Sequence, residues 1–203
     1  AVFTVDTGMC NVWAARYITP NGRRRVIGSF LHGSMANAVP HAIGAAKSSP
    51  GRQVVAMAGD GGLAMLLGEL ITIKALDLPV KIVLFDNATL GMVRLEMLVE
   101  GLPSYGTDSP EVDYAQVADA IGIPAVRVTD PKDVRGALRE AFDRPGPALI
   151  DVVTDPRALS IPPSITAEQV RGFAVAMSKE VLGGGLGEVV AMARSNLRNV
   201  PKP

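Results

Sequence analysis

The chain has 203 residues, of which 48% are hydrophobic and 20% are charged. This composition supplies enough apolar material for a packed core and too little charge for a disordered chain. The length fits one large domain, or one domain with an appendage. The 20 basic and 20 acidic residues balance. We therefore expect no nucleic-acid partner, because general nucleic-acid binders need a basic surface that replaces counterions.

Cysteine usage and targeting signals favour a cytoplasmic protein. Cys10 is the single cysteine, which is typical of a reducing compartment, and His32 and His41 do not stand at a familiar zinc spacing with it. No apolar run approaches the roughly 18 residues of a membrane span. The first residues contain no secretory signal and resemble a strand cut from a longer chain.

Short β-branched runs alternate with longer segments of helical period. The predicted strands are Val2–Val5, Val26–Ser29, Val54–Ala58, Val80–Phe85, Ala125–Val128 and Ala148–Val153. The predicted helices between them are Met9–Tyr17, Ser34–Lys47, Gly62–Leu76, Leu90–Val99, Tyr114–Ile121 and Pro131–Phe142. Several strands are almost continuously apolar, as expected for a parallel sheet covered on both faces. The pattern predicts an α/β fold with an open, mostly parallel sheet and helices on both faces.

The alternation stops after Ile161-Pro162-Pro163. Two helical segments follow, Thr166–Leu182 and Gly187–Leu197, and Thr166 with Gln169 predicts a capping box for the first. We therefore expect an α/β domain over residues 1–163 and a helical tail over residues 164–203. The segment Gly101–Pro110 is loop-like and is either a mobile lid or an ordinary surface connection.

A glycine-rich acidic turn follows the third predicted strand. The chain contains no Gly-Lys dipeptide, which excludes a P-loop, and a G-x-G-x-x-G fingerprint fails at Ala64. Instead the turn is Gly59-Asp60-Gly61-Gly62, at the carboxyl end of a strand, where open α/β sheets bind ligands. The Asp60 carboxylate suits a hard cation such as Mg²⁺. Gly61 and Gly62 allow a phosphate to approach the backbone closely.

An asparagine follows the next strand at a suitable interval. Asn87 lies 27 residues after Asp60, about the length of a helix, a turn and a strand. Because the carboxyl ends of parallel strands meet at one edge of the sheet, Asn87 is expected within reach of the same ion. A carboxylate, an amide oxygen, a backbone carbonyl and a diphosphate together suit the coordination of Mg²⁺.

Gly-Asp-Gly followed at this interval by Asn resembles the motif of thiamine-diphosphate enzymes. The resemblance implies that Asp60, Asn87 and the main-chain carbonyl of Thr89 bind the metal. It also implies that cofactor contacts come from Gly33, Ser34, Met35, Gly59, Asp60, Gly61, Gly62, Asn87, Thr89, Leu90, Gly91 and Met92. The family usually has Asn-Asn where this chain has Asp86-Asn87, so Asp86 adds a charge beside the site.

A second match lies upstream, in the segment Gly33-Ser34-Met35-Ala36-Asn37. The resemblance implies that Met35 is the apolar wedge that bends thiamine, and that the Gly33 carbonyl accepts the pyrimidine amino group. Such a bend prepays the orientation entropy of an internal proton transfer. Met35 and Gly33 are therefore the residues expected to act in catalysis.

Longer stretches are similar to the flavin-linked pyruvate:quinone oxidoreductases. They are residues 28–38, 52–62 and 78–83, and Ile161-Pro162-Pro163. The resemblance implies oxidative decarboxylation of pyruvate to acetate and CO₂, with FAD reduced and reoxidised by quinone. It also implies a homo-oligomer, a tetramer in the full enzyme. The resemblance further implies that the carboxylate that activates the pyrimidine ring belongs to an N-terminal domain and that FAD belongs to a middle domain. We expect neither domain in this chain, so the chain alone is expected to be inactive.

Two alternatives stay open. Acetohydroxyacid (acetolactate) synthases share the segment Leu90-Gly91-Met92-Val93 but carry a tryptophan at the position of Glu96, while the single Trp here is Trp13. Simple pyruvate decarboxylases carry a glutamate where Val93 stands, and valine cannot act as an acid. A non-catalytic α/β assembly module is the other alternative, against which the retained Asp60 and Asn87 argue.

The tail carries an apolar stripe that consists of Val170, Phe173, Met177 and Val181. The second predicted helix continues it with Val189, Val190, Met192, Ala193 and Leu197, while Lys179, Arg194, Arg198 and Lys202 are available to face anionic lipid. These features are compatible with peripheral contact at the inner face of the cell membrane. The alternative is that both helices pack against the sheet or against other domains.

Overall fold

The computed structural model describes residues 1–159 and 166–196. The chain forms two compact units, the first made of residues 1–88 and 111–154, and the second of residues 89–110 and those from 155 onward. The predicted boundary at residue 163 lies outside the described residues, as does the Ile161-Pro162-Pro163 stretch. That boundary stays a prediction.

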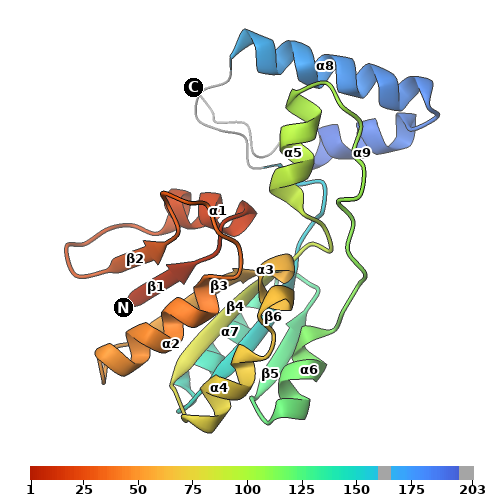
Figure 1. Ribbon diagram of the computed structural model, residues 1–203. Coiled ribbons are helices and arrows are strands. Elements are labelled where there is room, and N and C mark those ends of the chain that lie inside the picture. The colour runs from red at the N-terminus through yellow and green to blue at the C-terminus, as the bar shows by residue number, and fades with distance from the viewer. Residues whose placement is uncertain (160–165, 197–203) are drawn as a thin grey trace. The chain divides into compact units, whose positions relative to one another are not determined.

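The first unit is built on a six-stranded sheet in which every neighbouring pair is parallel. Its strand order is β2-β1-β3-β4-β6-β5 (Figure 1). The strands are β1 (Val2–Val5), β2 (Arg25–Gly28), β3 (Val54–Gly59), β4 (Val80–Asp86), β5 (Ala125–Val128) and β6 (Ala148–Val153). The open parallel sheet predicted from the sequence is confirmed.

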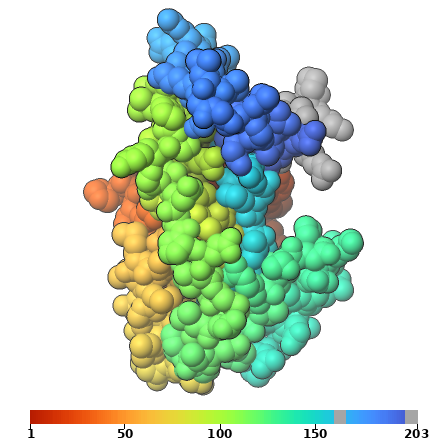
Figure 2. Space-filling model, turned by 90° about the vertical axis from the view of Figure 1, so that its right-hand side faces the viewer, coloured from red at the N-terminus to blue at the C-terminus, as the bar shows by residue number. Residues whose placement is uncertain are grey.

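Helices cover both faces of this sheet. Successive strand residues point to opposite sides, so the apolar strands present side chains that must be buried on both faces. The helices of the first unit are α1 (Met9–Tyr17), α2 (Ala38–Ser48), α3 (Asp60–Met65), α4 (Glu69–Ala75), α6 (Tyr114–Ile121) and α7 (Val134–Asp143). Ile82 and Leu84 pack with α2, α4 and α6, and α4 and α6 lie side by side (Figure 2). Val83 and Ile150 pack with α7 on the other face. Burial on both faces explains the continuous apolar runs.

Three predicted helices differ from the structure, two in where they begin and one because it is divided. The helix expected from Ser34 begins at Ala38, because Ala36 takes a left-handed backbone with φ 61°. The helix expected over Gly62–Leu76 is two helices, α3 and α4, because the backbone at Leu66 departs from helical values. The helix expected from Pro131 begins at Val134, since the Asp130 carboxylate accepts the Lys132 N–H at 2.9 Å and stabilises a turn.

The second unit consists of α5 (Gly91–Val99), α8 (Ala167–Leu182) and α9 (Leu186–Asn196) with their connecting segments. Its core contains the buried side chains Leu98, Leu159, Ala176 and Met192. The predicted capping box is confirmed, because the Thr166 hydroxyl accepts the Gln169 N–H and the Gln169 side chain accepts the Thr166 N–H. The predicted end of the last helix, Leu197, lies outside the described residues.

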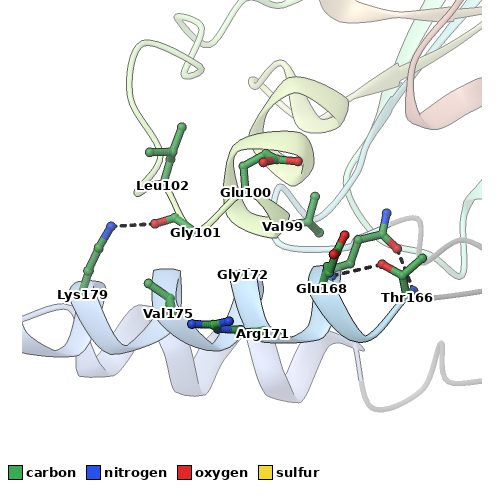
Figure 3. Close-up of a pocket in the computed structure, with 11 residues that line it drawn as sticks. Val99, Glu100, Gly101, Leu102, Thr166, Glu168, Arg171, Gly172, Val175 and Lys179 are labelled. Carbon is green, nitrogen blue, oxygen red and sulfur yellow. Dashed lines mark hydrogen bonds between the residues drawn. The ribbon is translucent and has the colours of Figure 1, made fainter.

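Close packing joins α8 to the end of α5 (Figure 3). A Cβ atom at Gly172 would stand 1.8 Å from the Val99 carbonyl oxygen, so only glycine allows this approach. Lys179 Nζ donates to the Gly101 carbonyl at 2.8 Å, just beyond the last turn of α5. A lysine at this position satisfies a carbonyl that follows a helix end.

The apolar stripe of α8 is divided between the core and the surface. Phe173 and Met177 pack against the core of the second unit, whereas Val170 and Val181 are exposed. In the parts of the chain that the structure describes, no helix is both long enough and apolar enough to cross a membrane. Peripheral membrane contact through the tail stays a prediction.

The loop Gly101–Pro110 is anchored at its far end within the second unit. The Thr107 carbonyl accepts the Thr89 hydroxyl at 3.0 Å and the Leu90 N–H at 2.8 Å. Thr89 and Asp108 form an isolated antiparallel bridge. A lid motion of this loop would have to break these hydrogen bonds or to pivot between them and Gly101.

Candidate functional site

The polar residues of the site lie at the carboxyl ends of β3 and β4. These strands pair in parallel with Gly59 opposite Phe85, so the residues that follow them meet at one edge of the sheet. Asp60 is the first residue of α3 and is 5% exposed. The backbone N–H groups of Gly61 and Asn87 favour the ionised form of its carboxylate. The structure therefore brings Asp60 and Asn87 together, as their spacing in the sequence led us to expect.

The Asp60 carboxyl group is held in an unfavourable environment for a lone negative charge. Burial and the nearby carboxylate of Asp86 raise the pKa of Asp60 to about 6, against an ordinary value of 3.8, although backbone N–H groups act in the opposite direction. Tyr114 donates a long hydrogen bond to the Asp60 carbonyl at 3.4 Å. A divalent cation would stabilise the ionised form of Asp60.

Asp86 is paired with an arginine that sequence reasoning did not find. Arg127 Nη1 donates to Asp86 Oδ2 at 3.0 Å, to Asp151 Oδ2 at 2.5 Å and to the Val112 carbonyl at 2.8 Å. Asp86 and Asp151 are both buried, and Asp86 Oδ1 also accepts the Ala88 N–H at 3.3 Å. This network fixes the segment that carries Asn87.

The segment Gly33–Asn37 forms a structured loop before α2. Its Ser34 N–H donates to the Ser29 hydroxyl at 3.1 Å, and the Ser34 carbonyl accepts the Asn37 side-chain amide at 2.7 Å. Gly33 is left-handed with φ 73°. Met35 is half-buried, between the left-handed residues Gly33 and Ala36. The wedge role of Met35 and the acceptor role of the Gly33 carbonyl stay predictions.

The remaining predicted cofactor residues divide between the two units. Gly59, Gly61 and Gly62 surround Asp60 in the first unit, whereas Thr89, Leu90, Gly91 and Met92 belong to the second. Thr89 is buried, and its carbonyl accepts the Gly91 N–H at 2.9 Å. Metal binding by that carbonyl and cofactor contacts by residues 90–92 stay predictions.

The donor set at Asp60 fits a hard cation that is shared with a phosphate ligand. Among residues 1–159 and 166–196, no three His, Cys, Asp or Glu side chains form a metal-binding group. A cation at this edge of the sheet would therefore need amide, carbonyl or phosphate oxygens in addition to the Asp60 carboxylate, and Mg²⁺ characteristically binds in this way. The buried carboxylate and the adjacent Asn87 fit such a site.

The open parallel sheet, with polar residues at the carboxyl ends of its strands, is typical of an α/β domain that binds a cofactor. Residues 6–152 match the family "Thiamine pyrophosphate enzyme, C-terminal TPP binding domain". The chain belongs to this family of thiamine pyrophosphate-binding domains.

Three relatives show the breadth of the similarity. A Bacillus subtilis protein, YdaP, whose name describes it as thiamine pyrophosphate-containing, is 33% identical over 96% of this chain and 34% of its own length. Acetolactate synthase 2 of Nicotiana tabacum is 38% identical over 75% of this chain and 24% of its own length. Acetolactate synthase 1 of Oryza sativa is 34% identical over 75% of this chain and 25% of its own length. The chain thus spans between about a quarter and a third of these relatives.

Proposed function

We propose that this chain supplies the diphosphate- and magnesium-binding part of an enzyme that decarboxylates pyruvate or a similar small 2-keto acid. The observation that carries the proposal is the parallel pairing of β3 with β4, since it brings Asn87 and the buried Asp60, two predicted metal ligands, to adjacent strand ends. Family membership supports the choice of cofactor.

The residues of this chain would hold and orient the cofactor. Asp60 and Asn87 would bind Mg²⁺, and the metal would in turn hold the diphosphate. Met35 would support the thiazolium ring and the Gly33 carbonyl would accept a hydrogen bond from the pyrimidine amino group. When bound, thiamine diphosphate supplies the nucleophilic carbon and the electron sink that decarboxylation of a 2-keto acid requires.

The fate of the decarboxylated fragment divides two candidates. The names of the Nicotiana and Oryza relatives favour acetolactate synthesis, in which the fragment is condensed with a second keto acid. Pyruvate oxidation, with FAD in the complete protein and quinone as acceptor, is favoured by the exposed Glu96, which stands where the synthases carry tryptophan. It is also compatible with a match to YdaP that extends over 96% of the chain, because no substrate is named for that protein.

Calorimetry tests the cofactor site. In the complete native protein, thiamine diphosphate should bind with Mg²⁺-dependent heat, and Asp60→Ala should abolish most of it. Asp133→Ala is the matched control, because Asp133 is an exposed carboxylate far from the site in the sequence and makes no side-chain cap hydrogen bond. Absence of Mg²⁺-dependent heat in the wild type, or full binding by Asp60→Ala, overturns the proposal and favours a non-catalytic module.

Product analysis separates the two candidate activities. With pyruvate alone, a synthase releases acetolactate and CO₂. A quinone reductase releases acetate and CO₂, and reduces one added quinone for each CO₂. Measuring all of these products on the same preparation decides between the candidates. The homo-oligomeric state, the membrane contact and the cytoplasmic location remain parts of the oxidase proposal.

A further inference from the structure

Asp6 is a buried acidic residue that none of the sequence motifs singled out. It directly follows β1 and is 2% exposed. Its backbone N–H donates to the Met57 carbonyl at 3.1 Å, which extends the pairing of β1 with β3. Strand order reverses between β1 and β3, and open α/β sheets bind ligands at such a point. Asp6 therefore stands at the edge of the sheet that carries Asp60.

The Asp6 carboxylate lies between two separate segments of the predicted cofactor site. Oδ1 accepts the Ala38 N–H at 2.7 Å, and the neighbouring Asn37 N–H favours the ionised form of this carboxylate. Asn37 and Ala38 form the junction between the Gly33–Asn37 segment, called here the Met35 loop, and α2. The Gly59 N–H, from the turn before Asp60, favours the ionised form as well. One side chain thus joins elements that are more than twenty residues apart in the sequence.

Gly62 packs against the same carboxylate. A Cβ atom at Gly62 would stand 2.3 Å from Asp6 Oδ2 and 3.3 Å from the Ala36 backbone nitrogen. Gly62 is itself buried. The close approach of Asp6 and of the Met35 loop is therefore enough to require glycine at position 62. This reason is independent of the predicted contact of Gly62 with a diphosphate. The two segments meet across the Asp6 side chain.

We propose that Asp6 is a positioning residue that fixes the Gly33–Asn37 segment relative to the Gly59–Gly62 turn. The inference rests on the proposed function, in which the first segment supports the thiazolium ring and the second binds the diphosphate. Both ends of one cofactor must be held at once. A buried carboxylate that accepts an N–H from one segment and packs against the other provides a rigid joint, because hydrogen bonds to a charged group are stronger than neutral ones.

A matched pair of variants tests the inference. Asp6→Asn removes the charge and one acceptor oxygen. Thr4→Val removes a hydrogen bond of similar burial from the same strand to the same helix start, because Thr4 Oγ1 donates to the Ala38 carbonyl at 2.7 Å. Within the described residues the Thr4 hydroxyl donates to α2 and not to the Gly59–Gly62 turn, so Thr4→Val controls for a loss of stability at α2 alone.

Amide hydrogen exchange on the cofactor-free complete protein is the first measurement. Asp6→Asn should accelerate exchange at Asn37, Ala38 and Gly59 together by about tenfold to a hundredfold, whereas Thr4→Val should leave Gly59 unchanged. Should Asp6→Asn fail to fold, Asp6→Ser, which keeps one acceptor oxygen, is compared with Thr4→Val in the same way. Acceleration confined to one of the two segments, or the same pattern in both variants, overturns the inference.

Cofactor binding is the second measurement. The Kd for thiamine diphosphate with Mg²⁺ should rise by about tenfold or more in Asp6→Asn and stay near the wild-type value in Thr4→Val. Equal affinity in Asp6→Asn and the wild type overturns the role of Asp6 toward the cofactor. Absence of binding in the wild type overturns the proposed function itself, while the exchange data still decide whether Asp6 joins the two segments.

Discussion

Arg127 Nη1 lies 3.0 Å from Asp86 Oδ2 and 2.5 Å from Asp151 Oδ2, so one guanidinium forms salt bridges with two buried carboxylates. The second oxygen of Asp151 is buried without a hydrogen-bond partner in the described structure. The network therefore contains more negative than positive charge, and its stability depends on the single cation. Asp86 lies directly before Asn87 in the sequence.

Removing the cation should destabilise the first unit strongly. Arg127→Met leaves Asp86 and Asp151 buried and uncompensated, and should lower the free energy of unfolding by about 3–5 kcal/mol. Chemical denaturation at neutral pH measures the change. Arg135→Met, at an exposed position of α7, is the control. Adding Asp86→Asn to Arg127→Met should restore part of the loss, and a double variant no more stable than Arg127→Met would show that the charge of Asp86 is not the cause.

The sequence predicted the elements whose signals are local. The bounds of β1, β5, β6, α1 and α6 agree with the prediction, because each is a short run with the period of one structure type and turn residues beside it. The interval from Asp60 to Asn87 was informative for the same reason, since parallel strands return to one edge after a fixed length of chain.

Contacts between distant residues could not be predicted in this way. Asp6 meets Ala38 across 32 positions, and Arg127 meets Asp86 across 41 and Asp151 across 24. A lone acidic residue after a strand and an arginine inside one carry no spacing signal. The association of α5 with α8 and α9 was missed likewise, because it depends on Leu98 reaching Ala176 and Met192.

Ionisation of Asp60 should make the ligand-free protein less stable as pH rises. The pKa of Asp60 is about 6 in the folded chain and 3.8 in the ordinary state. The unfolded chain therefore loses its proton first, so the contribution of Asp60 is fully present below pH 3.8 and is lost as pH rises through about 6. Burial also raises the pKa of Asp6 and of Asp151, so the effect of Asp60 is isolated as the difference between the wild type and Asp60→Asn.

Mg²⁺ with thiamine diphosphate should reverse this trend, because the metal binds the ionised carboxylate. The increase in Tm on adding both should be larger at pH 7.5, well above the pKa of about 6, than at pH 5. It should be nearly absent at both pH values in Asp60→Asn. Thermal denaturation with a chelator in place of Mg²⁺ provides the reference. An equal increase at the two pH values would contradict the assignment of Asp60 as the metal ligand.

The close approach of α8 to α5 should make Gly172 intolerant of any side chain. Gly172→Ala places a methyl group 1.8 Å from the Val99 carbonyl oxygen, and the helices must separate at a cost of about 1–3 kcal/mol. Amide exchange within α8 should accelerate accordingly. Gly136→Ala in α7 is the control, because beyond its own stretch of helix no atom of the described residues lies within 4 Å of the added methyl group, and alanine there should stabilise the helix by about 0.5–1 kcal/mol. Unchanged exchange in Gly172→Ala would show that α8 shifts at no cost.

The loop that presents Met35 depends on a left-handed residue at its start. Gly33 has φ +73°, and the nearest atom to an added Cβ is Thr7 Cγ2 at 4.0 Å, so Gly33→Ala is opposed by backbone strain and not by crowding. The substitution should cost about 1–2 kcal/mol of stability and weaken binding of thiamine diphosphate, because relief of the strain moves the residue two positions before Met35. Gly44→Ala lies in α2, where no described atom beyond its own stretch of helix comes within 4 Å of the added methyl group. It should instead stabilise the protein and leave the Kd unchanged. Urea denaturation and calorimetry on both variants measure the two effects. Equal gains in stability would mean that the loop accepts a right-handed backbone at Gly33.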